Sequence, residues 1–575
     1  MSPASLAAPD ANIARHLALM AAASPDRVAL KIPRGRTRAG DIDYLALSFA
    51  DLDAEVAAWT AQLTAAGLRR GDRTLVMVRQ GLPLIASAFA LFRLGAVPVI
   101  IDPGMSLKHF LACVARSRPR ALVGLPLAQI VSRVFRSAFS SVEVRVAASG
   151  SLTARLTDRT SKIVSSETTG LPNQKSAPAV CAAEELAAIL FTSGSTGAPK
   201  GVCYEHGMFD AQVRLIRDAY GIKPGEIDLP LLPIFALFNP ALGMTTIVPE
   251  IDPRRPADVD PAKIVQAIRQ ENVTNSFGSP TLWRKIGDHC LGKNLALPSL
   301  RRVLCAGAPV PAELWRTSHA FLPRGQLHSP YGATEALPLA TVSADDIASV
   351  SGRGACVGQP VREIEIKIIA IDDGPIATLA DARELPRGEI GEIIARGPVV
   401  TKSYDALPAA TAAAKIADTP VSQLSTLNPQ PGGAAAVWHR MGDCGYLDAE
   451  NYLWFCGRKA ERVETAAGPL HTEPCERVFR AYPHARRCAL VGLGPRGQQH
   501  PAMVVELDLP DSRARRGVAR ELRALALKHA DTATIKTFYF HPRFPVDVRH
   551  NAKIHRLALA QWAATAKGFE SDPKR

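Results

Sequence analysis

The sequence lacks the signatures of several protein classes. Its ten cysteines are dispersed, without a CxxC pair or a framework of close spacings, so we expect reduced thiols and no disulfide scaffold. The formal net charge of +14 comes without a block of like charges and without an RRM, zinc-finger or helix-turn-helix signature. These absences argue against a protein that binds nucleic acid. The sequence also has no internal repeat.

A long uninterrupted apolar run is missing as well. The most apolar stretch, residues 85–101, contains Arg93 and Pro98, which favours a buried helix-to-strand unit over a membrane-spanning helix. The N-terminus carries Asp10 and has no basic start ahead of an apolar block, so it does not look like a secretory signal. Its apolar spacing predicts an amphipathic helix. We therefore expect a cytoplasmic protein without a membrane span.

The composition is that of a globular protein with more than one domain. Apolar residues make up 47% of the 575 positions and charged residues 21%, close to the average of soluble proteins. A chain of this length exceeds what one hydrophobic core usually supports, so we expect a large composite domain and a smaller one. The basic excess suits phosphate-bearing ligands or an anionic membrane face equally well.

Short strand-like runs alternate with helical patterns through the first two thirds of the chain. This alternation is typical of βαβ units whose parallel strands are buried on both faces, and it predicts an α/β fold. A Ser/Thr-rich stretch, 149–179, is expected to be a loop before a strand at 187–191. The segments that carry the alternation are 73–78, 83–94, 97–101, 107–117 and 121–124.

The pattern changes in the last third of the chain. Short alternating strands at 389–400 and 446–455 predict a β-rich subdomain. The stretch between them, 406–436, is rich in Ala, Pro and Gly, and we expect it to be an exposed insertion.

New strands and a helix begin after Cys456, at 487–492, 502–507 and 512–529. A separate C-terminal domain is expected from this restart. The predicted domains are residues 1–456 and residues 457–575.

Residues 190–202, with the sequence LFTSGSTGAPKGV, are typical of an anion-binding loop. Glycines let backbone N–H groups approach phosphate oxygens, hydroxyls add donors and lysine adds a positive charge. A Walker A loop needs Gly-Lys-Ser/Thr at a helix start, whereas Pro199 precedes Lys200 and Gly201 follows it, so a P-loop NTPase is disfavoured. A Gly/Ser linker is the alternative. The candidate phosphate-binding residues are Thr192, Ser193, Gly194, Ser195, Thr196, Gly197 and Lys200.

This loop resembles the signature of the acyl-adenylate-forming superfamily, which includes acyl-CoA synthetases, luciferases and nonribosomal adenylation domains. The resemblance implies ATP and Mg²⁺ as cofactors. It implies a large N-terminal domain with several subdomains, built of mostly parallel sheets plus the β-rich subdomain, that binds ATP and an acyl chain. It also implies a small, mobile α+β C-terminal domain that closes over the site and carries a catalytic lysine.

The segment YGATE, residues 331–335, is similar to the superfamily's Tyr-Gly-x-Thr-Glu motif. The resemblance implies that Tyr331 stacks on adenine, that Thr334 binds the α-phosphate and that Glu335 holds Mg²⁺. An aromatic face, a hydroxyl and a carboxylate suit these roles. Taken alone, the pentapeptide also fits a turn that caps a helix, but its place downstream of the phosphate loop favours the functional interpretation.

Weaker matches follow in the expected order. The segment 305–309 resembles the one whose backbone lines the adenine pocket, and its alternative is a strand-to-turn junction. Asp443, in HRMGD, matches the aspartate that holds the ribose hydroxyls, because paired acceptor oxygens suit a vicinal diol. Gly457-Arg458 matches the start of the interdomain hinge, and by resemblance Arg458 approaches the ribose or phosphates. The additional ATP-binding candidates are Gly307, Ala308, Pro309, Gly332, Asp443 and Arg458.

The segment PVDVRHNAKIHR places Lys553 where the superfamily carries its catalytic lysine. By resemblance, this lysine neutralises the attacking carboxylate and the charge that grows on the α-phosphate in the transition state. A solvated surface lysine is the alternative, and the position near the chain end favours the catalytic role.

The sequence departs from the common pattern at the hinge and around the acyl site. Ala460 stands where the superfamily usually has Asp or Lys, and 465–473 replaces the Gly-rich turn that binds pantetheine. Where acyl-CoA ligases commonly place a histidine, PLLPIFALFNPALG offers the apolar Phe235, Leu237 and Phe238. These departures weigh against a CoA tunnel and suit a long acyl chain, so Phe235 and Phe238 are the candidate substrate-pocket residues.

The segments HRMGD, CGRKAERVET and FPVDVRHNAKI resemble the β-lactone synthetases of bacterial long-chain olefin biosynthesis over nearly the whole chain. The resemblance implies adenylation of a long-chain 2-alkyl-3-hydroxy acid, followed by attack of its own hydroxyl to give a β-lactone, AMP and pyrophosphate. Intramolecular attack has a large effective molarity, so no thiol carrier is needed.

Two other functions stay open from the sequence. The chain is alternatively a long-chain fatty acyl-CoA synthetase or fatty acyl-AMP ligase, or an inactive acyl-binding or scaffold protein that kept the fold. The presence of Lys200, Glu335, Asp443 and Lys553 argues against loss of activity. By resemblance, the expected partners are the pathway's thiolase, its NADPH-dependent ketoacid reductase and its α/β-hydrolase-like decarboxylase.

Overall fold

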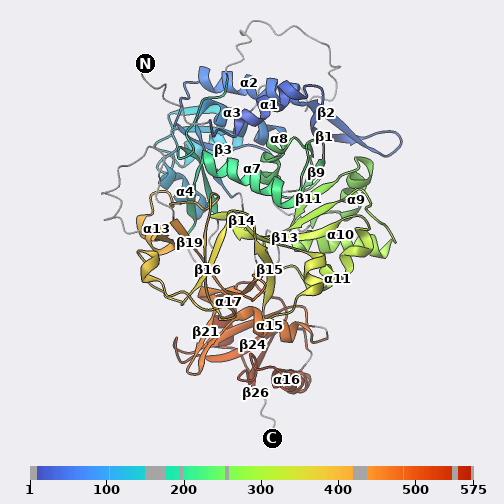
Figure 1. The fold of residues 1–575 in the computed structure, drawn as a ribbon, viewed down its shortest axis with the longest axis vertical. Helices are drawn as coiled ribbons and strands as arrows, with labels where there is room; N and C mark the ends of the chain where they lie inside the picture. The colour runs from blue at the N-terminus through green and yellow to red at the C-terminus, as the bar shows by residue number, and fades with distance from the viewer. Residues whose placement is uncertain are drawn as a thin grey trace.

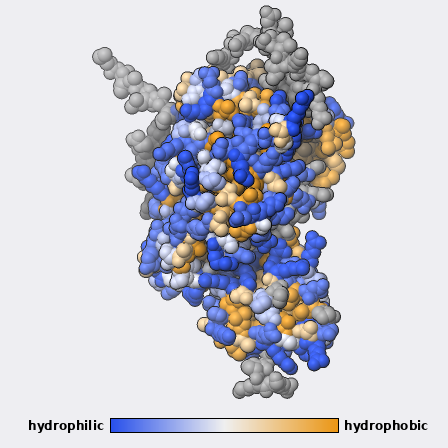
Figure 2. All heavy atoms as spheres, turned by 90° about the vertical axis from the view of Figure 1, so that its right-hand side faces the viewer, coloured by the Kyte–Doolittle hydropathy of each residue, from blue (hydrophilic) through white to orange (hydrophobic). Residues whose placement is uncertain are grey.

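The computed structural model describes residues 10–102, 104–148, 177–192, 198–252, 258–418, 437–483, 485–509, 511–546 and 554–570. Figure 1 shows an elongated molecule, with the N-terminal elements at one end and the elements that follow β20 (Leu453–Arg458) at the other. The surface in Figure 2 is largely hydrophilic with scattered apolar patches. All ten cysteines are free. No helix in the described ranges is long and apolar enough to cross a bilayer.

The first sheet has six strands in the order β6-β5-β3-β4-β7-β8. Its neighbours are parallel except β7 and β8, which are antiparallel. The predicted α/β alternation is confirmed, because helices connect these apolar parallel strands. The strands are β3 (Arg73–Met77), β4 (Val97–Ile101), β5 (Ala121–Gly124), β6 (Val144–Ala147), β7 (Leu186–Thr192) and β8 (Lys200–Glu205), with helices α3 (Leu82–Leu94), α4 (Leu107–Ser117) and α5 (Pro126–Val134).

Three further helices pack around this sheet. The predicted N-terminal helix is α1 (Ala14–Ala23), which buries Leu17 in a core shared with α2 (Phe49–Ala65) and α3. Helix α7 (His206–Tyr220) follows β8 and contributes Met208 to the same core. The predicted loop at 149–179 falls mostly outside the described residues, which resume at 177.

The second sheet is large and mixed, and one half of it is parallel. In that half the order is β13-β12-β11-β9-β10-β1, with β2 antiparallel at the edge. The strands are β1 (Val28–Arg36), β2 (Ile42–Ser48), β9 (Ile227–Pro230), β10 (Thr245–Ile247), β11 (Asn275–Gly278), β12 (Arg302–Cys305) and β13 (Gln326–Ala333), and the helices that follow β10, β11 and β12 are α9 (Pro261–Gln270), α10 (Pro280–Gly292) and α11 (Ala312–Phe321).

The other half of the large sheet is antiparallel and confirms the predicted β-rich subdomain. Its order is β16-β17-β19-β20-β15-β14, and β14 pairs with β13 of the parallel half. The remaining bounds are β14 (Ala336–Ser343), α12 (Ala344–Ser349), β15 (Ala355–Pro360), β16 (Glu365–Ile369), β17 (Gly391–Arg396) and β19 (Val437–Leu447).

The prediction that 406–436 is an exposed insertion is wrong for Lys415 and Ile416, whereas none of the residues 408–414 is buried. Helix α13 (Pro408–Ala414) and strand β18 (Lys415–Ala417) occupy this stretch, and β18 pairs with β19. Lys415 and Ile416 are buried as a result. An Ala-rich composition allows close packing as readily as exposure, and only the pairing with β19 decided between them. Residues 419–436 lie outside the described residues.

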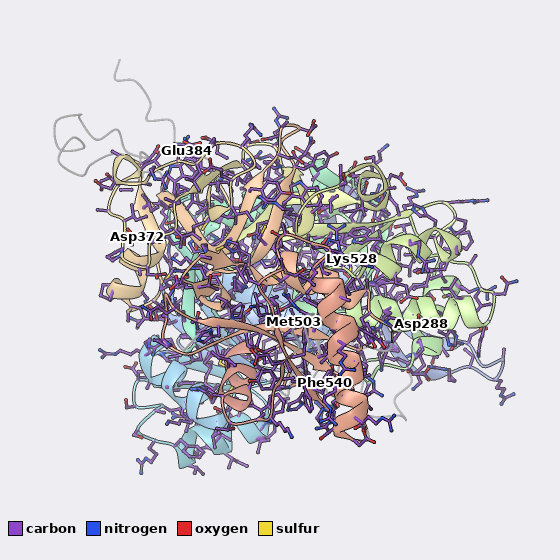
Figure 3. The ribbon with its side chains drawn as sticks, turned by 90° about the horizontal axis from the view of Figure 1, so that it is seen from below. Asp288, Asp372, Glu384, Met503, Lys528 and Phe540 are labelled. Atoms are coloured by element: carbon purple, nitrogen blue, oxygen red, sulfur yellow. The ribbon has the colours of Figure 1, made fainter. Side chains whose placement is uncertain are left out.

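The chain after β20 forms a smaller body with its own four-stranded sheet, β23-β24-β25-β26. Seen from below in Figure 3, this body, with Met503 and Phe540 labelled, lies in front of the large sheets. Strand β20 of the large sheet continues to Arg458, past the predicted domain boundary between residues 456 and 457. That boundary stays a prediction. The elements are η4 (Lys459–Glu461), β21 (Val463–Thr465), β22 (Gly468–Leu470), α15 (Thr472–Arg480), β23 (Cys488–Leu493), β24 (His500–Glu506), α16 (Ser512–Ala526), β25 (Thr537–His541), α17 (Arg556–Ala563) and β26 (Phe569–Glu570).

Candidate active site

A cleft of about 820 Å³ is lined by residues of the first sheet, of the large sheet and of η4. The structure brings predicted site residues from separate motifs into this one cavity. Ala308 and Pro309 follow Gly307 in sequence but do not line the cleft. Ser193, Gly194, Ser195, Thr196 and Gly197 lie outside the described residues, and for Thr192 only the backbone is described. The predicted residues that line the cleft are Lys200, Phe235, Gly307, Gly332, Thr334, Glu335 and Arg458.

Thr334 and Glu335 form the turn of a tight hairpin. Ala333 at the end of β13 pairs with Ala336 at the start of β14, so the two residues between them stand at the tip. A Cβ at position 332 would lie 2.4 Å from the Ala336 carbonyl oxygen, which explains the glycine of the motif. The hairpin therefore presents a hydroxyl and a carboxylate side by side to the cleft.

Hydrogen bonds from neighbouring segments fix the position of the hairpin tip. The Tyr204 hydroxyl on β8 donates to the backbone carbonyl of Thr334. Thr401 donates from its backbone N–H to the Glu335 carbonyl oxygen, at 2.9 Å. The Tyr404 hydroxyl donates to Glu335 Oε1 at 2.8 Å. The Glu335 carboxylate is therefore fixed in orientation at the cleft wall.

Tyr331, Asp443 and Arg458 form one connected group. The Tyr331 hydroxyl donates to Asp443 Oδ2 at 2.7 Å, and Arg458 lies 2.8 Å from Asp443 Oδ1. Antiparallel pairing of β19 with β20 sets Asp443 opposite Arg458. Burial and the Asp443 charge raise the pKa of Tyr331 well above its ordinary value, so its hydroxyl stays a donor.

Lys200 begins β8 and lines the cleft beside the end of the phosphate loop. It pairs with Thr192 across β7 and β8, so these strands bring the two ends of the loop together. Its Nζ lies 4.8 Å from the centre of the Tyr404 ring, within range of a cation–π contact.

Lys415 and His439 are buried near this site, and sequence reasoning missed them. They stand opposite each other in the pairing of β18 with β19. Lys415 Nζ donates to Thr401 Oγ1 at 3.2 Å, and burial lowers its pKa to about 7. His439 Nδ1 lies 3.1 Å from the Ala414 carbonyl oxygen, and burial, reinforced by Lys415, lowers the pKa of the imidazole well below its ordinary value. No motif marks these residues, because strand pairing alone places Lys415 beside His439, which lines the cleft.

The side of the cleft next to η4 is built around Glu392 on β17. Arg440 lies 2.6 Å and Lys459 lies 3.0 Å from Glu392 Oε2. Lys459 also donates to the backbone carbonyl of Asp372 at 3.0 Å, a residue labelled in Figure 3. These contacts attach η4 to the β-rich half of the large sheet, next to Ala460 in the cleft lining.

A second, narrow cavity of about 50 Å³ continues from the cleft into the parallel half of the large sheet. Phe235 and Phe277 line both cavities, and their rings stack with centroids 3.6 Å apart. Leu237 and Phe238 both pack on the N-terminal core, but only Phe238 lines the inner cavity. The wall is mainly apolar, and its polar exceptions include Asn239, Asn275, Ser276 and the buried Asp228, whose pKa is raised to about 7 by burial.

Lys553 lies outside the described residues. Arg556, three positions later, is described and buried between two carboxylates. Its Nε and one terminal nitrogen each lie 2.7 Å from Glu476, and the other terminal nitrogen lies 3.0 Å from Glu461 of η4. The segment that follows Lys553 is therefore attached to η4 and α15.

Comparison with known proteins agrees with this geometry. Residues 18–405 match the AMP-binding enzyme family. The chain is 44% identical over 566 residues to the olefin β-lactone synthetase of Xanthomonas campestris pv. campestris, covering 96% of this chain and 97% of that protein.

Solved structures share the fold. The amide bond synthetase McbA from Marinactinospora thermotolerans superposes with a TM-score of 0.73 at 23% identity, over 96% of this chain and 100% of that one. The O-succinylbenzoate coenzyme A synthetase MenE from Bacillus subtilis, in complex with ATP and magnesium ion, gives a TM-score of 0.69 at 21% identity, over 95% and 98%.

Proposed function

The chain belongs to the AMP-binding enzyme family, and we propose that it adenylates a long-chain 2-alkyl-3-hydroxy acid with ATP and closes the product to a β-lactone. The single observation that carries the adenylation step is the convergence of Lys200, Glu335 and Arg458, the ion-pair partner of Asp443, on one cleft. The lactone step rests on 44% identity to an olefin β-lactone synthetase over 96% of the chain. The chain is thus an adenylate-forming ligase, with AMP and pyrophosphate as its nucleotide products.

The nucleotide is proposed to lie across the cleft from Asp443 to Lys200. Asp443 Oδ2 accepts a hydrogen bond from Tyr331, and Oδ1 forms an ion pair with Arg458. A carboxylate oxygen can accept more than one hydrogen bond, which suits a ribose hydroxyl. The Tyr331 ring, whose hydroxyl donates to Asp443, is proposed to stack on adenine. At the other end Lys200 and the phosphate loop bind the phosphates.

Glu335 has the chemistry that Mg²⁺ needs. Mg²⁺ prefers oxygen ligands and usually takes one or two protein carboxylates together with substrate phosphates. The Glu335 carboxylate stands at the hairpin tip in the cleft lining, with its orientation fixed by Tyr404. The bound ion would neutralise charge on the phosphates.

In the first step the acid's carboxylate oxygen attacks the α-phosphorus, and the bond to the bridging oxygen breaks. The electron pair leaves with pyrophosphate. Thr334 is proposed to donate to the α-phosphate, and Lys553 to neutralise the charge that grows there. The attachment of Arg556 to Glu461 supports delivery of Lys553 by the small domain, residues 457–575, which we propose moves as a lid over residues 1–456.

In the second step the substrate's 3-hydroxyl attacks the acyl carbonyl carbon. The bond to the AMP oxygen breaks, AMP leaves, and the hydroxyl proton passes to solvent or a base. The apolar cavity behind Phe235 and Phe238 is proposed to hold an alkyl chain and to keep water away from the mixed anhydride.

The segment at 465–473 supports a reaction without CoA. It forms the tight β21–β22 hairpin, in which Thr465 pairs with Gly468, and then leads into α15. Ala460 in the cleft lining offers neither the carboxylate nor the amine usual in the superfamily. An acyl-CoA synthetase or acyl-AMP ligase is the alternative.

The test compares a 2-alkyl-3-hydroxy acid with the same acid lacking the hydroxyl, each with ATP and with or without CoA. We expect multiple turnovers of AMP and a lactone from the first acid, independent of CoA. The second acid should stop after about one turnover as bound adenylate. Rapid CoA-dependent turnover of the second acid would support the CoA synthetase, and absence of any AMP would support an inactive acyl-binding protein.

The substrate chemistry also implies partners. A thiolase and an NADPH-dependent ketoacid reductase would supply the 3-hydroxy acid, and an α/β-hydrolase-like decarboxylase would convert the lactone to an alkene and CO₂. We propose that the enzyme acts with these proteins in the cytoplasm.

A further inference from the structure

The positively charged residues of the cleft divide into paired and unpaired groups. Arg440 and Lys459 pair with Glu392, and Arg458 pairs with Asp443. Within the described ranges, neither Arg116 nor Lys200 forms an ion pair, although both line the same cavity. The positive charge at their end of the cleft is therefore available to an anionic ligand.

Arg116 is held at this end by its backbone and by a loop carbonyl. It belongs to the last turn of α4, which packs on the first sheet through the buried Cys113 and Val114. One terminal nitrogen of the guanidinium donates to the Pro199 carbonyl oxygen at 2.8 Å. Pro199 immediately precedes Lys200, so the Arg116 guanidinium contacts the residue next to Lys200. Arg116 is half-buried, and it retains further N–H donors toward the cleft.

We propose that Arg116 binds the β- and γ-phosphates of ATP and, after the first step, pyrophosphate. The inference rests on the adenylation proposed above. A guanidinium presents a planar fork that matches two phosphate oxygens, and an unpaired one in a cleft is a strong phosphate ligand. Adenylation breaks the bond between the α-phosphorus and its bridging oxygen, and the electron pair goes to pyrophosphate. Arg116 stabilises the negative charge that this leaving group gains.

A purely structural role for Arg116, as a tether for the phosphate loop, makes a different prediction. A loosened loop would lower the binding affinity of every nucleotide that contacts it. A lost β/γ contact affects only ligands that carry those phosphates, so AMP is the ligand that separates the two roles.

The experiment measures binding of ATP, AMP and inorganic pyrophosphate to the full-length protein by calorimetry, for wild type and Arg116→Gln. We expect the affinities for ATP and pyrophosphate to fall roughly 10- to 100-fold, the usual effect of losing hydrogen bonds to a charged group. AMP affinity should change less than about twofold. Lys108→Gln, an exposed residue of the same helix outside the cleft, is the matched control and should leave all three unchanged.

Equal losses for ATP and AMP, or no loss for any ligand, would overturn the proposal. If Arg116→Gln does not fold, Arg116→Lys, which keeps the charge but not the planar fork, is measured in the same way, with a smaller loss of the same selectivity expected. Lactone formation by the wild type reports on the proposed function separately. If the wild type binds ATP but forms no lactone, the lactone proposal fails and the binding result for Arg116 still stands. If the wild type forms lactone but Arg116→Gln weakens ATP and AMP binding equally, only the proposal for Arg116 fails.

Discussion

The Tyr331 hydroxyl donates a 2.7 Å hydrogen bond to Asp443 Oδ2 across 112 positions of sequence. The bond joins Tyr331 on β13 to Asp443 on β19, two strands of the same large sheet that β14, β15 and β20 separate. Because Arg458 forms an ion pair with the other Asp443 oxygen, the carboxylate is held in one orientation.

Asp443→Ala should weaken ATP binding before any chemistry, because contacts to ribose exist in the ground state. Calorimetry should give an affinity for ATP reduced roughly tenfold or more. Tyr331→Phe keeps the ring and removes only the hydroxyl, so a smaller loss is expected. Thermal melting of both variants checks that the fold is retained. An unchanged ATP affinity in Asp443→Ala would remove this residue from the site.

Lys553→Ala should reduce the rate of adenylate formation by two orders of magnitude or more. This reduction corresponds to a loss of about 3 kcal/mol of transition-state stabilisation. ATP affinity should stay within about twofold, because the charge is needed mainly in the transition state. Pyrophosphate release in a single turnover measures the first quantity and calorimetry the second. Lys536→Ala, an exposed lysine of the same small domain, is the control. Parallel losses of ATP affinity and rate would contradict the role.

The lowered pKa of Lys415 predicts that the free energy of unfolding depends on pH. Burial lowers its pKa in the folded protein from the ordinary 10.5 to about 7, so the unfolded chain binds more protons between these values. Stability therefore rises with pH across this window, and the cost of burying the charge is fully present below about pH 7. Lys415→Met removes that cost and should stabilise the protein most at low pH, by up to roughly 5 kcal/mol.

The measurement is the difference in Tm between Lys415→Met and wild type from pH 6 to about pH 10. The difference should shrink as pH rises through the window between the two pKa values. Lys223→Met, at an exposed position, corrects for the general effect of removing a lysine. A stabilisation that does not vary with pH would show that Lys415 is charged in the folded protein throughout.

Phe238→Ala should shift the preference of the enzyme toward longer alkyl chains. Phe238 lines the inner cavity, and each additional buried methylene contributes about 0.8 kcal/mol, or roughly fourfold in kcat/KM. The ratio of kcat/KM values across a series of 2-alkyl-3-hydroxy acids measures the shift. Leu237→Ala, adjacent in sequence and packed on the same core but absent from the cavity lining, should lower stability without changing the ratio. Identical chain-length profiles in the two variants would place the alkyl chain elsewhere.

Local sequence was sufficient for the motifs whose chemistry is local. The glycines and lysine around the phosphate loop, the YGATE hairpin and the Asp443 segment each need particular residue types at adjacent positions, so they are visible in a short window. The alternation of apolar strands and helices between Arg73 and Gly124 predicted the parallel sheet for the same reason, since a strand buried on both faces must be apolar throughout.

Only the tertiary structure decided which charges meet. Lys415 and His439 look like isolated polar residues in sequence, and they become neighbours because β18 pairs with β19. Arg116 is one of many arginines, and it reaches the cleft because α4 ends beside Pro199. The Ala-rich stretch after Ala406 was predicted to be exposed, and its helix α13 has no buried residue, but Lys415 and Ile416 of β18 are buried by pairing with β19. A charge acquires its pKa and its ligand from groups brought together by the fold, and sequence spacing carries no information about such long-range contacts.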